Sequence, residues 1–319
     1  MKQLKIGLAS LLTFQLLLAL TIFFSETQEE KSAKTPLISI EKDAINIIKI
    51  ASEADETELI KKDGLWVLAK LEQLPADAEK VNSALVQLSS IQTNWPITTT
   101  TSSHERFELT EKKYQRKIAI VKDEHTVDTI LLGSSPSFKK AHVRKLDDNN
   151  VYSLALNSYD FPAKIEDWLD KGLLAIKEQT KIKGTNFSLI KIEKKWSLEE
   201  SNIIDSQLDE SKAALLSSSL ASLKVIGLAK NEIDFSSEDA ITIEVFGHEN
   251  KQFQFLKKEN SYYVKRDDFP QVFTIGKTEF DKIAKISIID LITKIENTAN
   301  EVEVTGSPDP VNIDGLDKK

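Results

Sequence analysis

The sequence predicts an α+β protein in which an N-terminal transmembrane helix precedes two similar units, each an antiparallel sheet with a helix packed on it. Three observations predict this fold class. A run of nineteen uncharged residues, 6–24, stands near the start of the sequence. Two blocks of short stretches follow in which apolar and polar residues alternate, as in half-buried strands. Each block also contains one segment with apolar residues at three- and four-residue steps, the period of an amphipathic helix.

The composition is that of a globular protein with an acidic balance. The chain has 319 residues, of which 40% are hydrophobic and 29% are charged, so two domains of ordinary size would fit. The net charge of -8 is dispersed along the chain, which argues against a nucleic acid as a partner. Cysteine is absent, which excludes disulfides, thiolate catalysis and cysteine-ligated metals.

The uncharged run 6–24 has the length of a membrane-spanning helix. At about 1.5 Å per residue it would extend roughly 28 Å, close to the hydrocarbon core of a bilayer at about 30 Å. A signal peptide usually has a shorter apolar region followed by small residues, whereas this run ends in Ile22-Phe23-Phe24. We therefore expect a retained anchor. A cleaved signal peptide and a buried core helix are the alternatives.

The charges around this run predict its orientation. Two lysines precede the run and three glutamates follow it closely, which by the positive-inside rule puts residues 1–5 in the cytoplasm. We expect a single-pass protein of the inner (cytoplasmic) membrane that contacts membrane lipid through residues 6–24. The bulk of the chain would then be periplasmic or otherwise extracytoplasmic.

A polar linker, 25–36, separates the anchor from the first α+β unit, which we place at residues 37–174. The alternation in this unit predicts strands at 38–40, 45–50, 58–61, 65–68, 117–121, 127–132, 141–144 and 151–154. Asp77 has the position of a helix N-cap. The helix after it would bury an apolar face made of Val81, Ala84, Leu85, Leu88 and Ile91. A loop rich in threonine and serine divides the strands into two groups, and a short helix around Trp168 closes the unit.

The same order of elements recurs in the second α+β unit, residues 175–297. Strands are predicted at 187–192, 194–198, 241–246, 253–256, 262–266 and 272–276. A helix is expected after Asp209, and one or two closing helices between residues 280 and 295. Because Trp196 repeats the Trp-x-Leu step of Trp66, we interpret the pattern as an internal duplication. Chance similarity of two sheet-and-helix domains is the alternative. Residues 298–319 are predicted to be a flexible tail.

No group of residues forms a recognisable chemical site, so we predict no catalytic residues, no metal ligands and no bound cofactor. No two histidines have the spacing of metal ligands, and no nucleophile elbow occurs. The histidines are His104, His125, His142 and His248. Segment 133–137 has one glycine and lacks the lysine of a phosphate-binding loop, so we expect a hairpin turn there.

Three other features have ordinary structural explanations. The pairs Asp147-Asp148 and Asp267-Asp268 are typical of turns. A local basic patch is compatible with binding to anionic lipid or an acidic partner, although a solvated strand face is the more common origin of such a pattern. It consists of Lys139, Lys140, Arg144 and Lys145. Trp66 and Trp196 are expected to lie in the core under the helix that follows each of them.

Several short motifs resemble those of a known family. They are Gly64-Leu65-Trp66-Val67-Leu68, Leu74-Pro75-Ala76-Asp77 before an apolar helix, Leu131-Leu132-Gly133, and Ala141-His142-Val143-Arg144 before Val151-Tyr152. On these motifs the chain resembles the family known as domain of unknown function 4340 over about residues 38–290. Members are bacterial, are commonly membrane-anchored at the N-terminus, and accompany ABC-type transporter components similar to the gliding-motility auxiliary proteins. The resemblance implies an extracytoplasmic accessory subunit, and it supplies no catalytic residues.

Together these observations predict a non-catalytic, membrane-anchored extracytoplasmic accessory protein that is not an enzyme. We expect protein partners in the membrane or envelope, and the resemblance implies ABC transporter subunits among them. One alternative is an envelope glycan or peptidoglycan hydrolase that uses a carboxylate pair the sequence does not reveal. A further alternative is a structural spacer.

Overall fold

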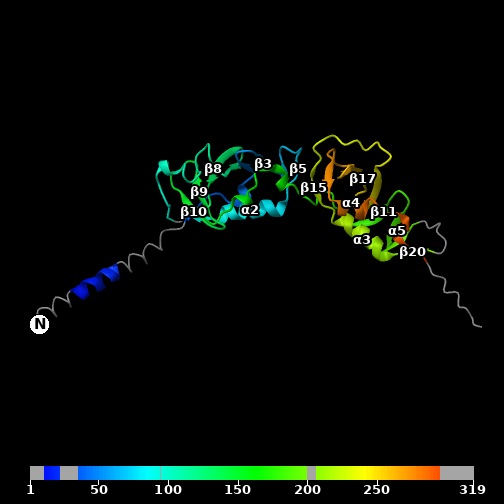
Figure 1. Ribbon diagram of the computed structural model, residues 1–319, viewed down its shortest axis with the longest axis horizontal. Coiled ribbons are helices and arrows are strands. Elements are labelled where there is room, and N and C mark those ends of the chain that lie inside the picture. Colours follow the sequence, from blue (N-terminus) through cyan, green and yellow to red (C-terminus); the bar gives the residue numbers. More distant parts are fainter. Residues whose placement is uncertain (1–10, 22–34, 94, 200–205, 295–319) are drawn as a thin grey trace, which may run out of the picture.

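The computed structural model describes residues 11–21, 35–93, 95–199 and 206–294 (Figure 1). The regular structure of this part of the chain is mostly β-sheet, arranged in two eight-stranded and two two-stranded antiparallel sheets. The predicted α+β class is therefore wrong, because strands predominate in both bodies and helices are few. The predicted N-terminal segment 1–5, most of the linker 25–36 and the tail 298–319 lie outside the described residues.

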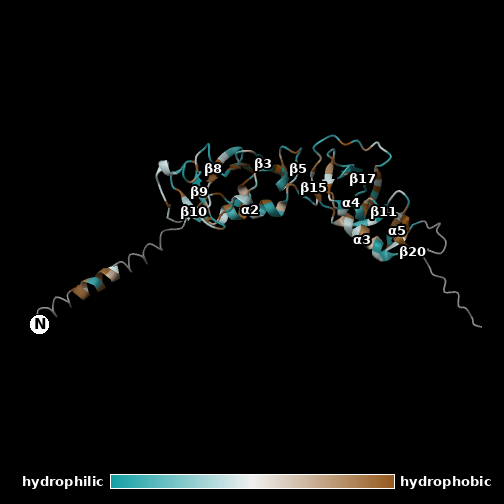
Figure 2. Ribbon diagram, in the orientation of Figure 1, coloured by the Kyte–Doolittle hydropathy of each residue, from teal (hydrophilic) through white to brown (hydrophobic). Residues whose placement is uncertain are grey.

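The described part of the predicted anchor, residues 11–21, is helical. Polar positions interrupt its apolar ones (Figure 2). In the part of the chain that the structure describes, no helix is long and apolar enough to cross a membrane. The predictions of a transmembrane helix at 6–24 and of a single-pass inner-membrane protein are corrected accordingly.

The first body is built on a sheet with the strand order β10-β9-β8-β7-β2-β3-β4-β5. Its strands are β2 (Ile47–Ala51), β3 (Glu56–Lys62), β4 (Leu65–Leu68), β5 (Leu74–Pro75), β7 (Arg116–Lys122), β8 (His125–Leu132), β9 (Ala141–Lys145) and β10 (Tyr152–Leu154). Around it lie helix α2 (Ala78–Ser90), the pair β1 (Thr35–Pro36) and β6 (Gln92–Thr93), and the 3-10 turns η1 (Lys42–Ala44), η2 (Thr101–Ser103), η3 (Ser158–Asp160) and η4 (Ile165–Trp168). The predicted strand at 38–40 is absent.

The second body has a sheet with the order β13-β12-β11-β16-β17-β18-β19-β15. Its strands are β11 (Gln179–Lys183), β12 (Ser188–Ile192), β13 (Lys195–Leu198), β15 (Val225–Leu228), β16 (Ile241–Gly247), β17 (Lys251–Lys258), β18 (Ser261–Arg266) and β19 (Phe273–Ile275). The remaining elements are helices α3 (Glu210–Ala221), α4 (Lys277–Ile283) and α5 (Ile288–Leu291), and the paired strands β14 (Ser206–Leu208) and β20 (Ile292–Lys294).

Seven strands of one large sheet correspond in order to seven of the other. The order β4-β3-β2-β7-β8-β9-β10 matches β13-β12-β11-β16-β17-β18-β19. In both bodies a meander of strands precedes a long helix, and the meander after that helix returns to pair with the first strand of the same large sheet. These returns are the pairings of β7 with β2 and of β16 with β11.

Each long helix begins at an aspartate and covers one face of its sheet. The Asp77 carboxylate accepts a hydrogen bond from the Lys80 amide at 3.0 Å, and Asp209 accepts one from the Ser211 amide at 3.0 Å. The apolar face of α2 is buried against alternate residues of the strands, and we call this covered side the inner face. Trp66 and Trp196 are buried in the same hydrophobic cluster, which confirms that both are core residues.

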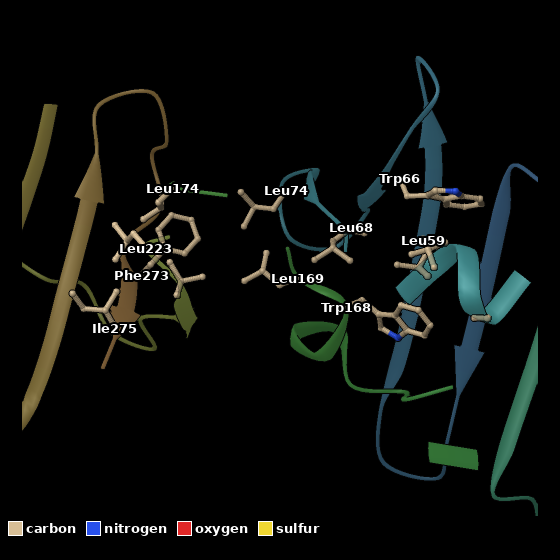
Figure 3. Packing of buried hydrophobic residues seen from close by; sticks show 14 of the residues in the cluster. Leu59, Trp66, Leu68, Leu74, Trp168, Leu169, Leu174, Leu223, Phe273 and Ile275 are labelled. Atoms are coloured by element: carbon tan, nitrogen blue, oxygen red, sulfur yellow. The ribbon is translucent and has the colours of Figure 1, made fainter. Parts of the chain in front are cut away.

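Segment 168–171 joins the two bodies by bonding to an edge of each sheet. The Asp170 amide donates to the Pro75 carbonyl of β5 at 3.0 Å, and the Val225 amide of β15 donates to the Lys171 carbonyl at 2.8 Å. Buried side chains continue across this joint in one cluster (Figure 3). Those nearest to it are Leu74, Leu169, Leu174, Leu223 and Phe273.

The tight turn between β3 and β4 provides a test of the backbone geometry. Asp63 and Gly64 have φ angles of 50° and 83°, as in a two-residue type I′ hairpin turn. A Cβ at Gly64 would meet nothing within 4 Å, so Gly64→Ala should cost only the left-handed backbone penalty of about 1–2 kcal/mol in urea unfolding. Gly227→Ala is the matched control, because Gly227 has equally open space but no left-handed φ. If both variants lost the same free energy of unfolding, the left-handed φ of Gly64 would not be the cause of the loss.

Candidate interaction surface

The four histidines do not come together in the structure. His104 is buried, and its Nε2 lies 2.9 Å from the Asn149 carbonyl oxygen. His142 lies in β9, with Nδ1 3.0 Å from the Ser134 hydroxyl, while His125 and His248 are exposed. Within the described ranges no cluster of three or more potential ligands could hold a metal ion.

The Ser134–His142 pair resembles part of a hydrolytic site, but the backbone amides of both residues already donate hydrogen bonds. The Ser134 amide donates to the Phe107 carbonyl at 2.9 Å, and the His142 amide donates to the Ser134 carbonyl at 2.9 Å. Neither amide is therefore free to stabilise an oxyanion. The His142 ring packs 4.4 Å from the ring of Phe107, so its environment is that of a packing residue.

The same contact explains the glycine of segment 133–137. A Cβ on Gly133 would lie 2.0 Å from the Phe107 carbonyl oxygen, so only glycine allows this close approach. The segment thus holds the loop before β7 against the sheet. A second, smaller hydrophobic cluster forms under that loop from Phe107, Leu109, Leu131 and Val151.

The predicted basic patch is largely neutralised. Arg144 is only 6% exposed, and its guanidinium donates to the carbonyls of Leu109 and Leu146 at 2.9 and 3.0 Å and to that of Asp148 at 2.9 Å. Lys145 pairs with the buried Asp128 at 2.5 Å. Of the four residues, only Lys139 and Lys140 remain on the surface.

One acidic pair lies beside a cavity of about 400 Å³ lined in part by Glu249, Lys251, Arg266 and Asp268. Hydrogen bonding to Lys251 lowers the pKa of Glu249. Burial raises the pKa of Asp268, but its bonds to Arg266 and Lys251 outweigh burial and lower it overall. A glycosidase needs one carboxyl group with a raised pKa to act as the acid. These two carboxylates therefore lack the property that the hydrolase alternative requires.

A different feature is the outward face of the first sheet, the side opposite α2. Directly paired positions on four adjacent strands carry apolar side chains there: Val67 opposes Ile60, Ile60 opposes Ile47, and Ile47 opposes Val121. We call these four residues the outward apolar row. None of them belongs to either hydrophobic cluster, and all except the buried Val121 are half-exposed. Leu65, 69% exposed, lies next to the row on β4.

The second sheet carries charge at the equivalent positions. Its row runs Ser197, Ile190, Lys181 and Phe246. The Lys181 ammonium lies 5.4 Å from the centre of the Phe246 ring and 2.5 Å from the Glu199 carboxylate. The apolar row is thus a property of the first body and not of the shared topology.

Comparison with known proteins gives one match. The family model described as Domain of unknown function (DUF4340) matches residues 66–239, from β4 to the loop before β16. The chain belongs to this family. The match covers the joint between the two bodies as well as Val67 and Val121 of the row. No curated protein and no solved structure was found to match the chain.

The buried Arg144 supports the loop over the outward face of β8 and β9, and its removal should be costly. Burial lowers its pKa relative to free arginine, but the side chain still donates to several carbonyls. Arg144→Met keeps much of the packing and leaves those carbonyls unsatisfied, so unfolding should become easier by about 2–4 kcal/mol. Lys140→Met, at an exposed position, should change stability by less than about 0.5 kcal/mol. A small effect at Arg144 would refute this role.

The environment of His142 predicts a pH dependence of stability. Burial lowers its pKa from the usual 6.5; the Ser134 bond opposes this shift, and Arg106 adds to it. The unfolded chain therefore binds the proton first, and the stabilisation present above pH 6.5 is lost as the pH falls through the folded pKa. The free energy of unfolding should drop more in the wild type than in His142→Asn between about pH 7.5 and about pH 5. Parallel pH profiles would show that His142 does not contribute.

Proposed function

We propose that this chain is a non-catalytic subunit that binds another protein through the outward apolar row. The row is the observation that carries the proposal: on the face opposite α2 it places the partly exposed Val67, Ile60 and Ile47 side by side, next to the buried Val121. Apolar surface that is buried at a protein interface supplies most of the binding free energy, whereas apolar surface that stays in contact with water stabilises nothing.

The partner that we propose is a component of an ABC-type transport or export assembly. This part of the proposal rests on the family resemblance. The environments of the histidines, of the Ser134–His142 pair and of the Glu249–Asp268 pair give no support to a hydrolytic reaction, which favours the binding function over the hydrolase alternative.

Photo-crosslinking in the cells that produce the protein tests this proposal. A benzophenone amino acid at the exposed position 65 lies beside the row, and position 195 is its structural equivalent on the second body. We expect a defined protein adduct, identified by mass spectrometry, from position 65 but not from position 195.

Ile60→Lys should reduce the yield from position 65 by about tenfold or more, because a charge in the row replaces an apolar contact worth 1.4 kcal/mol or more. Ile190→Lys is the control at the equivalent half-exposed position. Both variants are first compared by thermal unfolding, so that misfolding is recognised. Equal adducts from positions 65 and 195, or a yield that Ile60→Lys leaves unchanged, would refute the proposal.

A further inference from the structure

The charges around the outward apolar row indicate what kind of protein segment it receives. The acidic side chains at outward positions of β3 are already paired: Glu58 with Lys49 at 3.2 Å, and Glu56 with Lys70 at 3.3 Å. Lys62 and Lys117 also occupy outward positions, on β3 and β7, and among the described residues neither forms an ion pair. The unpaired charge at outward positions of β2, β3, β4 and β7 is therefore positive, although the whole chain carries -8.

The two lysines lie on opposite sides of the row. Lys62 comes two positions after Ile60 on β3, and Lys117 comes four positions before Val121 on β7, where β2 pairs in antiparallel direction with both strands. The acidic turn residues Asp63 and Asp123 lie past the ends of these strands and not at outward strand positions. At physiological salt a charge acts over about 8–10 Å, so carboxylates of a docked segment would sense Lys62 and Lys117 when they lie beside them on the sheet face.

We infer that the partner presents an amphipathic protein segment, with an apolar stripe along the row and carboxylates beside Lys62 and Lys117. This inference rests on the proposed function. Four strands at a spacing of about 4.8 Å make a row of roughly 14 Å, the length of about two and a half helical turns or four to five residues of strand. Carboxylates next to the lysines would orient the segment and accelerate its association.

A second copy of this chain is a poorer occupant of the same face. In a symmetric dimer the two identical faces meet, which brings the unpaired lysines of both copies into one interface without any added carboxylate. Like charges in an interface oppose association. Self-association is therefore an outcome that the experiment must separate from binding of an acidic segment.

Charge reversal in the full chain tests the inference. With the crosslinker at position 65, Lys62→Glu/Lys117→Glu should lower the adduct yield by about tenfold, and Lys62→Gln/Lys117→Gln should have a smaller effect. Lys122→Glu is the control, because this exposed lysine ends β7 on the opposite face. Added NaCl in cell extract should lower the wild-type yield and have less effect on the double Gln variant. The crosslinked peptide, sequenced by mass spectrometry, should contain apolar residues flanked by Asp or Glu.

The outcomes separate this inference from the proposed function. Three results would refute the inference that the partner segment is acidic. They are an adduct yield that charge reversal leaves unchanged, a crosslinked peptide rich in Lys or Arg, and an adduct to a second copy of this chain. The first two results would leave protein binding by the row intact. No adduct at position 65 in the wild type would instead count against the proposed function itself.

Discussion

The pairing of β2 with β7 determines both the core and the outward surface of the first body. These strands come from either side of α2, and their ladder pairs Ile48 with Ile120 and Ile47 with Val121. Ile48 and Ile120 are almost completely buried under the helix, so the core specifies the register. A shift of one residue would exchange the two pairs between the faces of the sheet. The outward apolar row therefore has the same register as the core, and no separate interaction is needed to position it.

The two bodies share this topology but differ in what their outward faces carry. The β11–β16 ladder repeats the β2–β7 ladder, yet it places Lys181 and Phe246 where the first body has Ile47 and Val121. A lysine that contacts an aromatic ring and a carboxylate at once is satisfied without a partner. The bonds of segment 168–171 to both sheets hold this solvated body against the apolar one. In our proposal, only the first body recognises a partner.

The sequence identifies strands where one face is apolar, and it fails where that signal is weak or two-sided. The strand β11 went unpredicted because Ile182 is its single large apolar residue. The sequence analysis did not identify the outward apolar row, because there the apolar signal is two-sided. Adjacent apolar residues such as Ile47-Ile48 and Ile120-Val121 place one side chain on each face of the sheet, and such doublets could have indicated the row. The burial of Arg144 depends on a loop 35 positions away, which no local pattern encodes. The apolar run 6–24 predicted a membrane span from its composition, whereas no helix in the described part of the chain is long and apolar enough to cross a membrane.

An apolar row on an open sheet face favours aggregation unless charges interrupt it. In this sheet the Lys49–Glu58 pair lies one step along the strands from Ile47 and Ile60, and Lys62 and Lys117 stand farther out. Such charges have little effect on the stability of the solvated protein, but they oppose the packing of this sheet face against the same face of a second copy. A partner with carboxylates at the matching positions would instead form favourable electrostatic contacts with Lys62 and Lys117. The charges that keep the free protein dispersed would then also select the segment that covers the row.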